Sequence, residues 1–119
     1  MNKSGPLIAN TIGLIYLGNN ADSRYNRGVE ITYDPQKNER NLRERHLGFD
    51  EALDFGFATA SYSKEVRNGE NRVVAVGYLR GRLHLLCLIP TAGGIRVISF
   101  RKANQREARK YGMPKAIDG

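Results

Sequence analysis

The chain has 119 residues, which is room for one domain with one hydrophobic core and excludes two. Its formal net charge is +7, and 13 of its 19 basic residues are arginine. Because a guanidinium group binds phosphate through a bidentate fork, this charge favours RNA or DNA as partner over a membrane surface. The single cysteine, Cys87, excludes a disulfide framework and a cysteine-rich zinc site, and it suits a reducing cytoplasm.

The first 28 residues differ in character from the rest. They mix glycine, asparagine and serine with one weak apolar run over residues 7–17, which is too short to span a bilayer. We find no amphipathic period in this segment. The sequence therefore predicts an irregular extension over residues 1–28 and a folded domain over residues 29–119.

The folded domain is expected to begin with a strand over Val29–Tyr33, where apolar residues alternate. Asp34 followed by Pro35 is typical of a helix start, with an N-cap residue and then a first helical residue. The helix predicted over Pro35–Arg45 is highly charged and should lie on the surface. A second short helix over Phe49–Phe55 places its apolar residues on one side.

The second half is expected to be strands until its last segment. A polar connection over Lys64–Asn71 interrupts them, and a final helix over Lys102–Tyr111 ends at Gly112. The predicted strands are Phe57–Ser63, Arg72–Leu79, Arg82–Ile89 and Ile95–Phe100. The order is strand, two helices, four strands and a helix. It predicts an α+β fold with a small, mainly antiparallel sheet and the helices on one side.

No metal motif is present, since His46 and His84 stand alone without ligand partners at usable spacing. His46 is expected to cap a helix end. His84 is expected to be structural or incidental, with a catalytic acid or base as the alternative. From residue 96 to residue 115 there are seven basic residues and one acidic residue, Glu107. Basic residues also open two predicted strands, at Arg72 and Arg82. Such clustering at strand ends favours a phosphate-binding site.

The turn before Arg82 decides whether Arg72 and Arg82 share a face of the sheet. A two-residue loop at Arg80-Gly81 pairs Leu79 with Arg82 and puts the two arginines on opposite faces. A three-residue loop pairs Tyr78 with Arg82 and puts them on one face. Gly81 is compatible with both registers.

Several segments, taken in order, resemble the BrnT toxins of bacterial type II toxin–antitoxin systems. The segment Glu30–Asn41 is similar to their opening strand, Asp-Pro-x-Lys motif and helical Asn. Phe49–Ala52 is similar to their Phe-x-x-Ala helix, and the region from Glu70 to Leu83 to their central strands. The segment Arg96–Ala103 resembles their Arg-Ile-Ile-Ser-x-Arg-x-Ala block.

This resemblance covers residues 29–118 and implies a RelE-like ribonuclease that blocks translation by cutting RNA. It also implies a BrnA-like antitoxin with a ribbon-helix-helix part as partner, contact with operator DNA only through that antitoxin, no membrane, and a cytoplasmic location. No metal or other cofactor is expected. Because the family lacks residues 1–28, we hypothesise that translation starts at Val29. Mass spectrometry of the native N-terminus tests this.

Metal-free RNA cleavage needs phosphate binding, charge stabilisation in the transition state and proton transfer. The sequence nominates Arg72, Arg82 and Arg101 for the first two tasks. Candidates for proton transfer are Lys37, Tyr111 and Glu70, although Lys and Tyr side chains ordinarily titrate near about 10. Further RNA contacts are expected from Arg96, Lys102, Arg106 and Lys110. The alternatives are a basic module that binds nucleic acid or a ribosomal surface without cutting it, and an interaction domain without a nucleic-acid partner.

Overall fold

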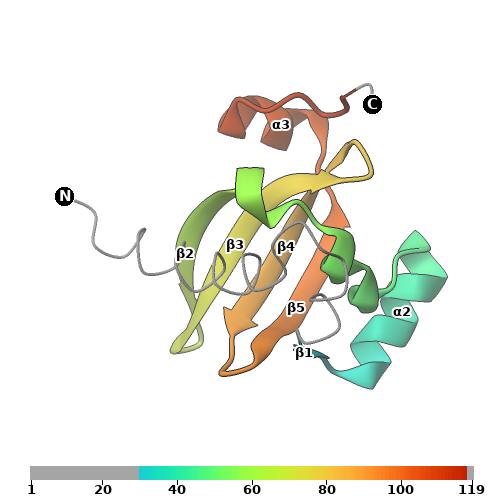
Figure 1. Ribbon diagram of the computed structural model, residues 1–119, viewed down its shortest axis with the longest axis vertical. Helices are drawn as coiled ribbons and strands as arrows, with labels where there is room; N and C mark the ends of the chain where they lie inside the picture. The colour runs from blue at the N-terminus through green and yellow to red at the C-terminus, as the bar shows by residue number, and fades with distance from the viewer. Residues whose placement is uncertain (1–29, 118–119) are drawn as a thin grey trace.

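The computed structural model describes residues 30–117, which form an α+β fold around one sheet (Figure 1). The predicted fold class is confirmed. The proposed extension over residues 1–28 and the hypothesised start at Val29 lie outside the described residues. The elements in chain order are β1 (Glu30–Thr32), α2 (Pro35–Arg45), the 3-10 helices η2 (Phe49–Asp54) and η3 (Phe57–Thr59), β2 (Ser61–Arg67), β3 (Glu70–Leu79), β4 (Arg82–Pro90), β5 (Gly94–Lys102) and α3 (Gln105–Tyr111).

The five strands lie in the order β1-β5-β4-β3-β2, and every pair is antiparallel except β1 with β5. Two tight turns build the meander. Asn68-Gly69 joins β2 to β3, Arg80-Gly81 joins β3 to β4, and all four residues have positive φ. Two consecutive left-handed residues are the geometry that two-residue hairpins prefer, because it matches the twist of the strands.

Two predicted boundaries in the sheet are wrong. The expected strand Phe57–Ser63 begins as the 3-10 helix η3, whose Phe57 is buried, and the expected polar connection Lys64–Asn71 lies mostly in strands. Among the described strands, β2 lies at the edge of the sheet with one neighbour, so its polar side chains remain in solvent and the strand lacks an apolar signal. The last helix starts at Gln105 because Asn104 is its N-cap.

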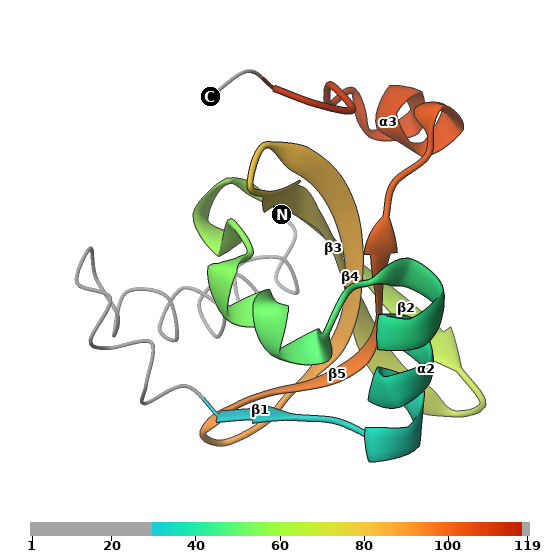
Figure 2. The same ribbon diagram turned by 90° about the vertical axis from the view of Figure 1, so that its right-hand side faces the viewer.

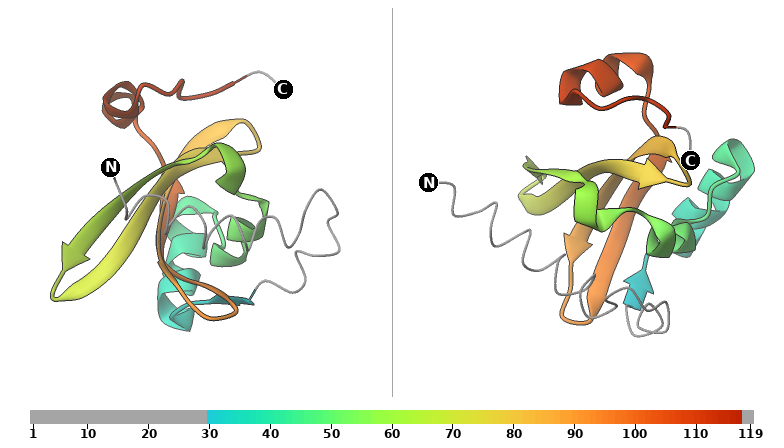
Figure 3. Two further views of the ribbon diagram at one scale, coloured as in Figure 1. Left: turned by 60° about the vertical axis from the view of Figure 1, so that its left-hand side comes forward. Right: turned by 45° about the horizontal axis from the view of Figure 1, so that its top comes forward.

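The helices cover both faces of the sheet, so the expectation that they lie on one side is wrong. The larger core cluster joins η2 and η3 to Val73, Leu86 and Phe100 on one face. A smaller cluster joins Ala108 of α3 to Val76, Leu83 and Ala103, and the strand register puts Val76 and Leu83 on the other face. Figures 2 and 3 show α3 and η2 on opposite sides of the strands.

Helix α2 is a surface helix, as predicted, and a polar residue anchors it. Asn41 is its one buried residue, and its Nδ2 donates to the Leu47 carbonyl at 3.0 Å and the Phe100 carbonyl at 2.9 Å. The helix ends at His46, which adopts the left-handed conformation and donates its N–H to Leu42. The predicted capping place of His46 is therefore confirmed. These contacts fix the end of α2 against β5.

Candidate functional site

A cavity of about 500 Å³ lies on the face of the sheet that α3 partly covers. Strands β2 to β5 form its floor and α3 forms one wall. We call it the α3 pocket, and its lining residues are Ser63, Lys64, Glu65, Arg67, Arg72, Val74, Leu85, Cys87, Ser99, Arg101, Glu107, Lys110 and Tyr111.

The strand register explains why Arg72 and Arg101 meet in this pocket. Arg72 faces Glu65 of β2, and Arg101 faces Leu85 of β4. Because side chains alternate between faces along a strand, both arginines project from the same face as Cys87. Two guanidinium groups that are far apart in sequence are thereby held on one rigid surface.

Arg101 is fixed by a bidentate ion pair with Glu107 at the start of α3. Its two terminal nitrogens lie 2.9 and 2.6 Å from the Glu107 carboxylate oxygens. Glu107 also accepts a hydrogen bond from the Asn104 N–H at 2.9 Å, which closes the capping box of α3. The hydrogen bonds from Arg101 lower the pKa of Glu107 to about 2, and Glu107 in turn raises the pKa of Arg101. The ion pair therefore holds the Arg101 guanidinium at the pocket and attaches α3 to the end of β5.

Arg72 lies over the pocket floor and is only 18% exposed. Its guanidinium contacts Glu70 at 3.0 and 3.1 Å, on the side toward the β2–β3 turn. Burial, with a smaller contribution from Glu65, raises the pKa of the Cys87 thiol, and the neighbouring Arg72 opposes this rise. Cys87 is thus a neutral floor residue beside a cation.

The α3 pocket combines a cationic surface with two kinds of group that can move protons. Five basic and two acidic side chains line it, so its charge favours an anion. Tyr111 provides a hydroxyl at the α3 wall, where Lys110 Nζ lies 5.4 Å from its ring centre. Glu65, which pairs with Arg67 at 3.2 Å, provides a carboxylate on the β2 side. The arrangement can bind a phosphate between a potential acid and a potential base.

A second cavity of about 790 Å³ lies on the opposite face, next to the end of α2. We call it the His84 pocket. It is lined by Glu44, Arg45, His46, Leu47, Glu51, Leu79, Arg80, Arg82, His84, Arg101 and Lys102. Arg101 contributes to both cavities.

His84 is a buried residue at this second cavity. Its Nδ1 lies 2.7 Å from the Arg82 carbonyl, and its ring centre lies 5.5 Å from that of Phe100. Burial lowers the pKa of His84, and the charges of Arg82, Lys102 and Arg80 lower it further against the opposing bond to the Arg82 carbonyl. A carbonyl only accepts hydrogen bonds, so in the neutral ring Nδ1 carries the proton and Nε2 the lone pair.

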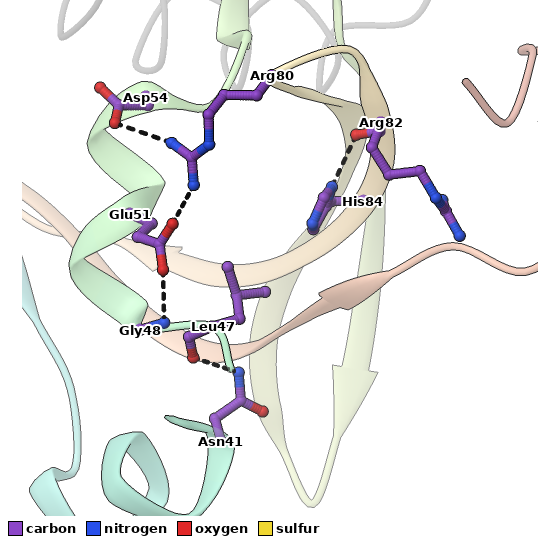
Figure 4. A network of polar contacts seen from close by, with 8 residues as sticks. All are labelled: Asn41, Leu47, Gly48, Glu51, Asp54, Arg80, Arg82 and His84. Carbon is purple, nitrogen blue, oxygen red and sulfur yellow. Dashed lines mark hydrogen bonds and ion pairs between the residues drawn. The ribbon is translucent and has the colours of Figure 1, made fainter. Parts of the chain in front are cut away.

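A charged network borders the His84 pocket on the η2 side (Figure 4). Arg80 reaches from the β3–β4 turn to Glu51 and, at 3.3 Å, to Asp54. Glu51 also accepts a hydrogen bond from the Gly48 N–H at 2.9 Å, at the start of η2. These contacts tie η2 to the turn and neutralise Arg80.

The structure does not bring together all three arginines nominated for phosphate binding. Leu79 pairs with Arg82, so the β3–β4 loop has two residues, and Arg72 and Arg82 project from opposite faces. Arg72 and Arg101 share the α3 pocket, whereas Arg82 lines the His84 pocket and donates to the Leu83 carbonyl at 2.8 Å.

The remaining predicted site residues are distributed between the α3 pocket, the His84 pocket and surfaces outside both. Tyr111 and Lys110 line the α3 pocket, and Lys102 lines the His84 pocket. The following four line neither cavity: Lys37, Glu70, Arg96 and Arg106. Lys37 is exposed on α2, and Glu70 contacts Arg72 from outside the pocket.

Sequence reasoning missed Glu65 and Glu107 as pocket residues. Glu65 falls in the segment that was predicted as a loop, so its side-chain direction could not be assigned. Glu107 had a usable signal, because Asn104 and Glu107 have the spacing of a capping box. Between residues 30 and 117 no three His, Cys, Asp or Glu side chains are grouped as metal ligands. Over the same range no helix has the length and apolar character needed to cross a membrane.

Comparison with known protein families gives a match over most of the folded domain. A family model described as "Ribonuclease toxin, BrnT, of type II toxin-antitoxin system" matches residues 33–107, which is more than half of the chain. No curated protein and no solved structure matches. The matched range contains β2 to β5 with Arg72, Arg101 and Glu107.

Proposed function

Since the chain belongs to the BrnT family of ribonuclease toxins of type II toxin–antitoxin systems, we propose that the α3 pocket cleaves RNA without a metal ion. Membership of this family means that the protein is a toxin with ribonuclease activity, that its target is RNA, and that its partner is a protein antitoxin. The observation that carries the proposal is that Arg72, Arg101 and Tyr111 line one pocket.

In the proposed reaction the two arginines act on the scissile phosphate. The ribose 2′-oxygen attacks the phosphorus, the bond to the 5′-oxygen breaks, and the products are a 2′,3′-cyclic phosphate and a 5′-hydroxyl. Arg72 and Arg101 bind the non-bridging oxygens, where negative charge grows in the transition state. Loss of one such donor costs roughly 10²–10³ in rate by analogy with oxyanion holes.

Two further residues move the protons. Glu65 lies across from Arg72 on the neighbouring strand, so it can accept the proton of a 2′-hydroxyl whose phosphate Arg72 holds. Tyr111, on the α3 wall, gives its proton to the departing 5′-oxygen. Afterwards Glu65 releases its proton to water and Tyr111 takes one from water, so no net proton is gained or lost. Glu107 serves as a positioning residue, because both of its oxygens are engaged by Arg101.

The biological setting follows from the same family. We place the toxin in the cytoplasm, where RNA cleavage inhibits translation. A BrnA-like antitoxin with a ribbon-helix-helix part neutralises it and connects it to operator DNA. Lys110, which lines the α3 pocket, adds a contact to the RNA backbone.

The test is cleavage of fluorescent RNA by the full chain in the presence of EDTA. We expect cyclic-phosphate products from the wild-type protein and a rate loss of about 10²–10³ for Arg72→Ala and Arg101→Ala. The matched control is Arg43→Ala, an exposed arginine on α2 that lines neither pocket. Intact RNA under conditions where binding is measured would instead support the non-catalytic binding module.

A further inference from the structure

We propose that the His84 pocket is a nucleotide-binding subsite that holds RNA next to the scissile phosphate. This rests on the proposed cleavage in the α3 pocket. The ligand is one nucleotide of the same strand, with its phosphate at Arg45, Arg82 and Lys102 and its base near His84.

The first argument is continuity between the two cavities. β1 pairs with β5 at Gly94, Ile95 and Arg96, and Asn41 of α2 donates to the Phe100 carbonyl further along, so among residues 30–117 no strand pairs with the end of β5 on that side. Arg101 and Lys102 are neighbours there and project to opposite faces, and Arg101 lines both pockets. A single strand bound at Arg101 can therefore pass around the end of β5, beyond the Asn41 contact, from one pocket into the other.

The second argument is unneutralised charge. Arg45, Arg82 and Lys102 form no ion pair with any carboxylate of the described chain, whereas the arginines of the α3 pocket do. Arg45 is steadied by the Asn41 side-chain oxygen, and Arg82 by backbone carbonyls. Of the two acids at this cavity, Glu51 is neutralised by Arg80, so the cations outnumber what Glu44 can offset. Three cations without an ion-pair partner among the described residues, two of them held by hydrogen bonds, favour a phosphate.

The third argument is that the cavity also suits a base. Its volume of about 790 Å³ lies in the range of small-ligand pockets, and Leu47 and Leu79 supply apolar lining. Figure 4 shows the His84 ring extending from its bond to Arg82 toward the space between Arg80 and Leu47. The lone pair on its Nε2 can accept a hydrogen bond from an N–H group of a base. The arginine and lysine side chains around it are donors, and they cannot accept that hydrogen. The pocket therefore selects for the donor edge of a base.

The test compares a dinucleotide, which fills only the α3 pocket, with a longer oligonucleotide that also reaches the His84 pocket. We expect Arg45→Gln and Lys102→Gln each to raise KM for the longer RNA about tenfold and to leave kcat and dinucleotide cleavage unchanged. Each variant should also reduce the slope of the logarithm of the binding constant against the logarithm of salt concentration by about 0.7. This is the value expected for the loss of one phosphate contact on a single strand. Arg43→Gln is the matched control.

His84→Phe keeps a ring against Phe100 and removes the acceptor, so it should change base preference in the longer substrate without changing dinucleotide cleavage. Its folding is checked by thermal melting, and the two surface variants decide the question if it is unstable.

The outcomes separate the two proposals. Unchanged KM in both surface variants overturns the subsite, as does an equal loss on the dinucleotide. Weaker binding of the antitoxin with unchanged RNA binding also overturns it, because the cavity is then a protein-docking surface. If the wild type cleaves nothing, the proposed function fails. Binding of a 2′-O-methyl oligonucleotide that the same variants weaken would then still support the subsite.

Discussion

The ion pair between Arg101 and Glu107 gives a prediction whose size follows from the structure. Folding lowers the pKa of Glu107 from its ordinary 4.5 to about 2. At about 1.4 kcal/mol per pH unit this corresponds to roughly 3 kcal/mol. Because the Arg101 side chain is 37% exposed, solvent screens the pair. We therefore expect Glu107→Gln to cost about 1–2 kcal/mol at neutral pH, while its amide oxygen still accepts the Asn104 N–H.

The pH dependence gives this prediction its sign. A carboxyl whose pKa is lowered on folding stabilises the protein fully above its ordinary pKa of 4.5, and the contribution is lost as the pH falls toward 2. The Tm of the wild type should exceed that of Glu107→Gln by about 4–8 °C per kcal/mol at pH 7, and the gap should close in acid.

Circular dichroism melts at neutral and acidic pH measure this gap. Glu39→Gln, which changes an exposed carboxylate on α2, is the control and should show no gap. A gap that is absent at pH 7, or that stays constant down to pH 3, would refute the assignment of the pair. The same variant should slow RNA cleavage by up to about 10²-fold, because Arg101 loses its fixed orientation.

Four other variants test the fold and the site. Asn41→Ala leaves two buried carbonyls without their donor and should cost about 2–4 kcal/mol in denaturant unfolding; a loss under about 0.5 kcal/mol would contradict the anchoring role. Gly77→Ala places a Cβ 2.8 Å from Phe55 Cζ and should cost about 1–3 kcal/mol. Gly69→Ala meets no atom within 4 Å, and its positive φ should cost about 1–2 kcal/mol. Expression of the full chain in bacteria should arrest growth, and that of Arg101→Ala should not; arrest by both would remove Arg101 from the mechanism.

The central strands and α2 could be predicted because their signals are local. Apolar runs mark β3 and β4, and Asp34 with Pro35 marks the helix start. Strand β2 was misplaced because an edge strand exposed to solvent carries few apolar residues. Because β2 was misplaced, Glu65 was assigned to a loop. The side-chain direction of a loop residue cannot be predicted from the strand pattern, so Glu65 was missed.

The candidate site could be predicted in part for a similar reason. Basic residues at strand ends identified Arg72 and Arg101, but the face that each occupies depends on one turn. Gly81 fits a two-residue and a three-residue loop, and only the observed pairing of Leu79 with Arg82 decides between them. One residue of register thus separates Arg82 from the α3 pocket. The sequence also could not predict that α3 packs on the face of the sheet opposite to η2, because a short amphipathic helix can pack on either face.

The pairing of β1 with β5 affects the stage of synthesis at which the sheet and the α3 pocket can form. Thr32 and the Ile95 carbonyl that it contacts are 63 residues apart, and Arg101, Glu107 and Tyr111 follow Ile95 in the chain. Contacts of such long separation form only after the loop between them has been closed. A nascent chain that has not yet exposed β5 and α3 therefore lacks both the closed sheet and the α3 wall of the pocket. An antitoxin present at that stage would meet the chain before the proposed site is complete.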